Sequence, residues 1–438
     1  MRTLITQMRN VAVIGLLSMP IATIAQQAQI DNLRAYDKTG VNVFETPKVL
    51  DTKFDGLKVR IGAGFTQPFQ SLSHENSGAV KLYPRLASGF AIAQANLYTD
   101  VQLADGIRLN LTTYLSSRHH NESWVKGGYI QMDKVPFKGE FWDKIMKVAT
   151  VKVGHMEINY GDMHFRRSDG GHALYNPFIE NYIMDAFATE VAAEVYLQKN
   201  GLLGMVALSN GLINGGFQKP LMPGSTTETY KRSPSVYGKL AYDKKVQEKI
   251  RVRASGSFYY NQSDGRSTLY GGDRTGSNYF YVTEAEAATT TGNAFSGRVN
   301  PGFTNQVASV QFNLFAKVHG LEVFGTLENS KGGSYAEEVA NFDKRKANQL
   351  AVEAVYRLGK NENLFVGAKY NKVSGQMISK VLDEQSIDRT ALAAGWFVTN
   401  NILMKAEYVN QKYNDYPTAN ILAGAGFKGV VVQAIVGF

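Results

Sequence analysis

Apolar and polar residues alternate in short stretches along most of the chain. In residues 57–65, for example, Leu57, Val59 and Ile61 alternate with Lys58 and Arg60. The same two-residue period recurs in 94–103, 250–258, 308–317 and 349–357. Successive side chains of a strand point to opposite faces, so this period predicts strands with one apolar and one polar face. Walls with an apolar outside and a polar inside are typical of membrane β-barrels.

The spacing of these stretches predicts about sixteen strands and two kinds of connection. We place the strands near 57–65, 90–103, 107–116, 123–134, 145–157, 184–198, 202–210, 235–243, 249–260, 305–317, 321–329, 346–358, 363–373, 387–399, 402–411 and 427–438. Gaps after even-numbered strands are mostly short and contain hairpin residues, such as Asp105-Gly106 and Asn200-Gly201. Gaps after odd-numbered strands are mostly long, which is the outer-membrane pattern of periplasmic turns and extracellular loops. The prediction is an all-β, transmembrane, antiparallel up-and-down β-barrel, with 14–18 strands compatible with the pattern.

The two ends of the chain fit an exported barrel. Arg2 and Arg9 precede an apolar stretch at 11–24, which is shorter than the ~20 residues of a spanning helix and favours a signal peptide over an anchor. The predicted organisation is a signal peptide at 1–25, a periplasmic N-terminal extension at 26–56 and an outer-membrane β-barrel at 57–438. The last strand ends in Phe438, with Val432 predicted to face lipid and Val431 the lumen.

Charge and composition modify this picture only slightly. The formal net charge is +9, and removing a signal peptide with two Arg and no acids leaves +7. Such a charge suggests a polyanion in a soluble protein, but in a barrel its location decides, so no nucleic-acid partner is predicted. The chain has no Cys, which excludes disulfides and thiolate zinc sites. Its 23 Tyr and 23 Phe agree with aromatic girdles at the membrane interfaces.

The long gap within 155–190 is the most unusual segment. It combines His164, Arg166, Arg167 and Asp169 with several aromatic residues, which a loop that stays in solvent would not need. We predict that this third long loop folds into the lumen and that these four residues form a pore constriction. Rings of Arg select anions. The alternative is an outward loop carrying a solvated charge cluster.

The polar faces of the predicted strands supply candidate pore-lining residues, and bases outnumber acids among them. An excess of bases predicts a mild anion preference through the local field. The alternative is that most charges pair across the wall and leave a weakly selective pore. No plug-like domain precedes the wall, and an empty sixteen-strand barrel leaves an aqueous channel. The pore-lining residues are Lys58, Arg60, Arg108, Lys152, Arg251, Arg253, Lys369, Lys405, Glu190 and Glu194.

Other chemistry finds little support in the sequence. His164, Ser168, Asp169 and His172 bring hydrolase residue types together, but two arginines interrupt them and no nucleophile elbow is present. Asp162, His164 and Asp169 match no metal-ligand spacing. We therefore predict no enzyme, no catalytic residues, no cofactor and no metal. The gap at 261–304 has the composition of an exposed, flexible loop.

Several segments together resemble a known family. The export signal, the alternating wall, terminal Phe438 and the segments GDMHFRRSD (161–169) and NPFIENYIMDAF (176–187) look like an outer-membrane porin of the Bacteroidetes type. NVFETPK (42–48) and FDGLKVRIGAGF (54–65) are also similar to this group. The layout resembles the phosphate-selective porin family, which implies a sixteen-stranded anion channel, typically a trimer. That family attracts phosphate with an arginine ladder and a lysine cluster, and Arg166 and Arg167 match it only by lying in the third long loop.

Two functions follow as hypotheses. The first is an outer-membrane porin for passive diffusion of small hydrophilic solutes, with a mild preference for anions. The alternative is a binding or scaffold barrel that partners a surface nutrient-uptake or secretion complex. In either case the expected partners are the lipid of a Gram-negative outer membrane and the barrel-assembly machinery, which recognises a terminal aromatic residue in the families that this chain resembles. Bilayer conductance distinguishes the two.

Overall fold

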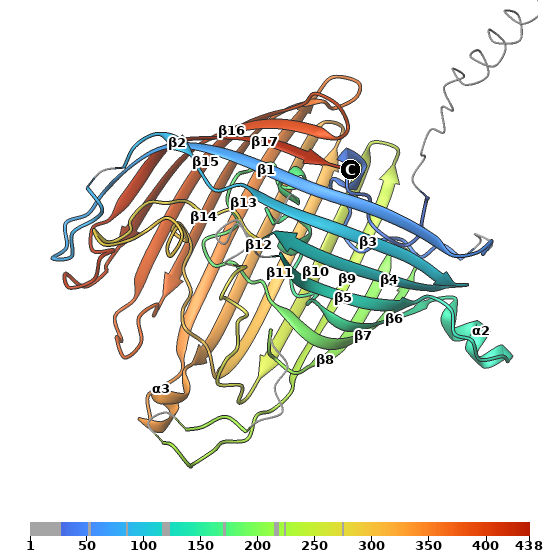
Figure 1. The fold of residues 1–438 in the computed structure, drawn as a ribbon, viewed down its shortest axis with the longest axis horizontal. Coiled ribbons are helices and arrows are strands. Elements are labelled where there is room, and N and C mark those ends of the chain that lie inside the picture. The colour runs from blue at the N-terminus through green and yellow to red at the C-terminus, as the bar shows by residue number, and fades with distance from the viewer. Residues whose placement is uncertain are drawn as a thin grey trace, which may run out of the picture.

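The chain folds into one closed antiparallel β-barrel (Figure 1). The computed structural model describes residues 28–50, 54–84, 86–115, 123–169, 172–213, 219–222, 225–273 and 276–438. The predicted signal peptide at 1–25 lies outside these residues. The first strand pairs with the last, from Gly64 opposite Gly437 to Glu75 opposite Gly426, and its other edge pairs with the next long strand. This closure confirms the predicted fold.

Sixteen strands cross the wall, and a seventeenth, β2 (Gly89–Phe90), is a two-residue addition to the edge of β1 beyond β3. Each pairs with its neighbours in chain order. The crossing strands are β1 (Lys58–Glu75), β3 (Gln94–Ala104), β4 (Ile107–Leu115), β5 (Ser123–Met132), β6 (Ala149–Glu157), β7 (Thr189–Lys199), β8 (Leu202–Ser209), β9 (Ser235–Gln247), β10 (Ile250–Asn261), β11 (Gln306–Val318), β12 (Leu321–Gly333), β13 (Arg345–Leu358), β14 (Leu364–Gly375), β15 (Gln385–Phe397), β16 (Ile402–Asn414) and β17 (Gly426–Gly437).

The short helices lie between these strands. Helix α2 (Glu140–Met146) joins β5 to β6 at the end of the short turns, and α3 (Tyr335–Val339) lies in a long loop at the opposite end (Figure 1). Three 3-10 turns, η1 (Lys38–Gly40), η2 (Met163–Arg166) and η3 (His172–Leu174), belong to segments before or between strands. No helix among the described residues is long and apolar enough to cross a membrane.

The outer face of the wall is apolar and the inner face is buried. Leu240, Val206 and Phe312 point outward and are 73%, 64% and 61% exposed. In β17, Val430 and Val436 are exposed, whereas Val431 is only 1% exposed. The predicted facing of the last strand is therefore right, with Val432 on the outer side. An apolar belt around a closed barrel is the surface that lipid chains contact.

One strand is much longer than its pattern indicated. Residues 57–65 were the predicted extent of the first strand, but β1 continues to Glu75. Pro68 interrupts the pattern, because proline cannot donate to a ladder and demotes a sequence from strand assignment. Here Pro68 stays within β1 opposite Gln433, and its carbonyl accepts a hydrogen bond from the Ala91 amide at 2.9 Å.

Most of the long connection between β10 and β11 is packed, so the prediction of an exposed loop at 261–304 was wrong for most of its length. Residues 286–292 are largely exposed. Leu269, Tyr270, Phe280 and Val282 in this connection are 0–2% exposed. The Tyr270 hydroxyl hydrogen bonds Glu328 Oε1 of β12 at 2.8 Å, on the inner face of the wall. Its Gly, Ser and Asn residues permit an irregular backbone, and its aromatic side chains supply the apolar surface that is buried.

The segment before β1 also lies inside the barrel. The Lys38 amide donates to the Asn400 carbonyl, in the short turn between β15 and β16, at 2.8 Å. Further along, Asn42 donates to Glu322 Oε1 at 2.6 Å, and Phe44 is 2% exposed against Phe315 and Phe324. We call residues 28–50 the N-terminal insert. It lies in the lumen at the short-turn end.

Candidate channel constriction

The third loop, residues 158–188 between β6 and β7, runs inside the barrel against strands β13 to β16. Its described residues form no strand ladder, so many of its buried amides need side-chain acceptors. The wall supplies them, because Glu407 accepts from the Ile179 amide at 2.8 Å, Asn371 from Ile183 at 2.7 Å and Gln349 from Met184 at 3.0 Å. Residues 170–171 of this loop lie outside the described part.

Wall cations satisfy the carbonyls of the same loop. Lys405 Nζ donates to the carbonyls of Ala173, Asn176 and Phe178 at 2.9, 2.8 and 2.5 Å. Lys369 Nζ donates to the Glu180 carbonyl at 3.0 Å. Both lysines point inward, as expected of the pore-lining set, but they lie beneath the third loop. The ammonium groups therefore hold the loop instead of facing open lumen.

Arg166 is a buried anchor at the bottom of the third loop. It is 1% exposed, with Nη2 at 3.0 Å from Glu353 Oε2 of β13 and Nη1 donating to Asn42 of the N-terminal insert. Its guanidinium carbon lies 5.0 Å from the Phe324 ring centroid. A buried charge is tolerated only when it is paired. The contacts of Arg166 with Glu353 and Asn42 therefore hold the third loop, the N-terminal insert and the wall together.

Arg167 and Asp169 lie on the other side of the loop. Arg167 makes two hydrogen bonds to Asp185, of 3.0 and 2.6 Å, and covers the Phe187 ring at 3.8 Å. Asp169 forms ion pairs with Lys126 of β5 and, at 3.4 Å, with Arg167. Burial raises the pKa of Asp169, against the pull of the Lys126 ammonium.

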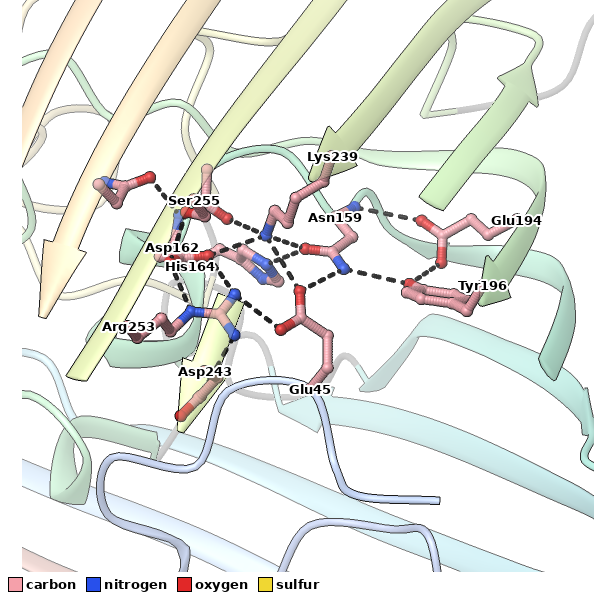
Figure 2. Close-up of polar contacts among 12 residues, drawn as sticks. Glu45, Asn159, Asp162, His164, Glu194, Tyr196, Lys239, Asp243, Arg253 and Ser255 are labelled. Carbon is pink, nitrogen blue, oxygen red and sulfur yellow. Dashed lines mark hydrogen bonds and ion pairs between the residues drawn. The ribbon is translucent and has the colours of Figure 1, made fainter. Parts of the chain in front are cut away.

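A charge cluster around Asp162 ties the third loop, the N-terminal insert and the wall together (Figure 2). Asp162 accepts two hydrogen bonds from Arg253, of 2.7 and 2.8 Å, one from Ser255 at 2.7 Å and one from Lys239 at 3.0 Å. Glu45 of the insert pairs with the same cations, 2.7 Å from Arg253 and 3.3 Å from Lys239. The two acids thus balance the two bases.

The cluster fixes the charge of both acids. Burial alone would raise the pKa of Asp162, yet the Lys239 and Arg253 cations hold it well below its usual range. By the same balance the pKa of Glu45 falls to about 2. His164 lies beside this cluster, with Nε2 2.9 Å from Asn159 Oδ1 and Nδ1 3.2 Å from Glu157 Oε1. The carboxylates of Asp162 and Glu45 therefore remain ionised at neutral pH.

The remaining predicted pore-lining residues face inward and are mostly paired. Lys58 lies at the short-turn end, 2.7 Å from Asp55. Glu190 accepts from Tyr259 at 2.8 Å, and Glu194 from Tyr237 at 2.9 Å. The other pairs are Arg60 with Asp100 at 2.5 Å, Arg108 with Asp133 at 2.6 Å and Arg251 with Asp243 at 2.6 Å.

Lys152 differs from the other inward cations. Its ammonium lies 5.1 and 5.0 Å from the ring centroids of Tyr129 and Tyr196, which is cation–π range. Within the described part of the chain it has no carboxylate partner within 4.0 Å. Lys152 therefore forms no ion pair with a described residue, although Glu194 of β7 lies directly opposite it in the β6–β7 ladder.

Open space inside the barrel is off-centre. A cavity of about 240 Å³ lies between the N-terminal insert, the third loop and the inner faces of β3 to β7. Lys152, Tyr129 and Tyr196 line it, together with Asp169 and His164. The opposite half, along β13 to β16, is occupied by the third loop. Of the four predicted constriction residues, two therefore line the cavity, and Arg166 and Arg167 lie behind it.

The residue types that suggested hydrolysis or metal binding are not arranged for either in the described part of the chain. Ser168 is fully buried, and its Oγ accepts from Asn176 at 3.0 Å. His164 is engaged by Asn159 and Glu157, and the side chain of His172 lies outside the described part. No group of three or more His, Cys, Asp or Glu side chains among the described residues could hold a metal ion.

The sequence pattern did not identify several residues that matter most here. Glu45 and Lys48 lie in the polar N-terminal insert, which shows no alternation, and Lys48 Nζ is 3.5 Å from Asp133 Oδ1. Lys126 pairs with Asp169 and Asp273 across the lumen. The segment NVFETPK stood out in the sequence only for its family resemblance. A large aromatic residue, Phe44, next to an acid, Glu45, in an otherwise irregular segment was the signal that could have pointed to a packed role.

Comparisons with known proteins agree with this architecture. No protein-family model matches the chain, and no curated protein matches it. The solved anion-selective porin from Comamonas acidovorans is similar, with a TM-score of 0.53 at 11% identity over 87% of this chain and 100% of that one. The channel DcaP of Acinetobacter baumannii has a TM-score of 0.49 at 9% identity over 89% and 100%, and Salmonella typhi OmpF has 0.47 at 11% over 88% and 98%. The first similarity shows the fold, so the chain is a porin-like, sixteen-strand antiparallel barrel.

Proposed function

We propose that the protein is an outer-membrane channel for passive diffusion of small hydrophilic solutes. The observation that carries the proposal is the cavity of about 240 Å³ beside the third loop, inside a closed wall with an apolar exterior. A solute crossing the barrel would pass along β3 to β7, because the third loop occupies the opposite side. The side-chain amides of Asn96, Asn110 and Gln131 there can replace water around a polar solute.

We extend the proposal to a mild anion preference. Its basis is Lys152, a cavity-lining cation without a carboxylate within 4.0 Å among the described residues. Arg34 also lines the cavity without an ion pair, but its guanidinium donates to the Gly40 and Phe165 carbonyls. In a narrow, low-dielectric passage one such charge has more effect than several paired ones. The sequence resemblance to phosphate-selective porins makes phosphate the first anion to compare with chloride.

Planar-bilayer recording tests both statements. Purified full-length protein should show discrete conductance steps, and reversal potentials in a salt gradient should favour anions. Lys152→Gln should reduce the anion-to-cation permeability ratio, whereas Lys199→Gln, an exposed lysine at the short-turn end of β7, should not. An unchanged ratio in Lys152→Gln refutes the preference, and an absence of conductance refutes the channel.

A second candidate is a binding or scaffold barrel. The observation that favours it is the amount of chain in the lumen, where the N-terminal insert, the third loop and the 262–305 connection are all packed. A barrel that acts as a scaffold would give no conductance under any applied voltage.

We also propose a homotrimer, because the family that the sequence resembles typically forms trimers, and native mass spectrometry in detergent measures this directly.

A further inference from the structure

Five lysines gather on the outside of the barrel, near the long-loop ends of neighbouring strands. They belong to β12, β13, β14, β16 and β17, and all are exposed. Their chain neighbours Ser330, Ala347 and Val373 are fully buried on the inner face, which places the lysines on the outer one. We call this set the lysine belt: Lys331, Lys346, Lys372, Lys412 and Lys428.

The belt is poorly compensated by the protein itself. Lys331 lies directly opposite Lys346 in the β12–β13 ladder, and like charges in such positions repel each other. Lys372 is 3.7 Å from Asp388, which also lies directly opposite Lys412 in the β15–β16 ladder. The Asp388 carboxylate accepts from Tyr370 at 2.6 Å and Asn414 at 3.0 Å as well. The other four lysines have no ion pair among the described residues.

The five lysines lie at similar heights on the wall. Barrel strands are tilted, so two residues at the same height on neighbouring strands are not direct partners in the ladder but are offset along the strand. From each strand to the next one in the chain, this offset is toward the short-turn end. At that end of the β12–β13 pair, for example, Leu321 begins β12 opposite Tyr356, and β13 extends two residues further, to Leu358. The lysines are offset in the same direction. The Gln376 amide donates to the Lys346 carbonyl, so Gln376 lies opposite Lys346, and Lys372 of β14 lies four residues closer to the short-turn end than Gln376.

The opposite side of the barrel lacks this feature. At the long-loop ends of β4 to β10, the described outward residues are apolar or uncharged. The lysine belt therefore covers one sector of the circumference and is not a general property of the rim. The corresponding residues elsewhere are Leu115, Val125, Val191, Leu208, Val236 and Tyr260, with exposed fractions of 37–71%.

We propose that the lysine belt binds the phosphate groups of a polyanionic membrane lipid in the leaflet at the long-loop end. The proposal goes beyond conduction and rests only on the barrel spanning a membrane. Outward leucines such as Leu327 and Leu350 lie below the belt and would contact acyl chains, while the flexible lysine stems let their ammonium groups reach the headgroup. Two lysines opposite each other, with no acid between them, form a pair that an inserted phosphate would stabilise.

Lipid binding can be measured on the full-length protein in neutral detergent. The probe is a bisphosphorylated glycolipid, titrated and followed by native mass spectrometry. The variant with Lys331, Lys346, Lys372 and Lys412 changed to Gln should bind it roughly 600-fold more weakly if the four contributions add, since a membrane-surface lysine contributes about fivefold. The control changes Lys138, Lys199, Lys249 and Lys360, four exposed lysines of the short-turn side, to Gln and should retain wild-type binding.

A second variant separates binding from folding. Lys346→Glu places an acid opposite Lys331, so the barrel should resist unfolding at least as well as wild type while binding the lipid more weakly. Equal lipid loss in the belt and control variants, or unchanged binding in both belt variants, overturns the proposal. Displacement of the lipid by inorganic phosphate at equal phosphate concentration would also overturn it, because the site would then be one for free anions. Conductance of the belt variants should equal that of wild type, which keeps this test independent of the channel proposal.

Discussion

Asp162→Asn is the sharpest test of how the lumen is organised. The aspartate accepts four hydrogen bonds from Arg253, Ser255 and Lys239, and it is 1% exposed. The asparagine keeps one acceptor oxygen but turns an amide NH₂ toward the Arg253 guanidinium. Removing one partner of a buried pair typically costs ~3–5 kcal/mol. Glu45 still neutralises part of the charge, so we expect a loss at the lower end, about 3 kcal/mol in the free energy of unfolding.

The assay is urea unfolding in lipid vesicles, followed by tryptophan fluorescence and by single-channel recording. Asp105→Asn is the control, because it makes the same chemical change at an exposed pair with Lys134, where the expected effect is about 0–1 kcal/mol. The double variant Asp162→Asn with Lys239→Met restores the charge balance and should recover part of the loss. A loss below about 1 kcal/mol for Asp162→Asn would refute the reasoning, since the cluster would then be hydrated rather than buried. Because the third loop would lose its tie to β10, current noise should rise in the same variant.

Three further outcomes follow from the structure. Val432→Arg on the lipid side of β17 should cost ~2–4 kcal/mol in vesicle refolding, whereas Val431→Arg should also destabilise, because Val431 is packed inside, and equal stability of Val431→Arg and wild type would contradict this packing. Deleting Phe438, whose amide and carbonyl both bond Ala63, should lower surface levels in cells more than it lowers the melting temperature of the folded barrel, and normal surface levels would contradict it. Burial raises the pKa of Asp264 to about 8, so its ionisation opposes folding as pH rises from about 4 to 8; Asp264→Asn should raise the melting temperature at pH 8 and flatten its fall with pH, and an unchanged pH profile would count against it.

The wall could be predicted from sequence because its information is local. Alternation in a single strand decides which side chains face lipid, and paired glycine-containing turns such as Asn200-Gly201 mark the hairpins. The facing of Val430 to Val432 follows from that alternation alone. The length of β1 could not be predicted from the alternation. Pro68 looks the same in the sequence whether the strand ends there or continues past it at a position that needs no N–H donor.

The filling of the lumen could not be predicted in the same way. Arg166 and Glu353 are 187 positions apart, and nothing near either residue specifies the other. The aromatic content of the third loop indicated a packed segment, but not which arginine would line the cavity and which would be buried behind it. The 262–305 connection and the N-terminal insert show no regular alternation of apolar and polar residues, which is typical of loops. Their polar groups are satisfied by inward wall side chains, and that partner surface exists only once the barrel has closed.

The location of the positive charge changes what it can do. Most inward bases lie within 4 Å of an acid, as Arg60, Arg108, Arg251 and Arg253 do, and such pairs create little field at a distance. The lysine belt lies on the outer face, where its charges would act on lipid and not on a solute in the lumen. The formal charge of the chain therefore says little about ion selectivity. Selectivity depends instead on the few charges that line the cavity without a partner, and Lys152 is the residue at which that argument can be tested.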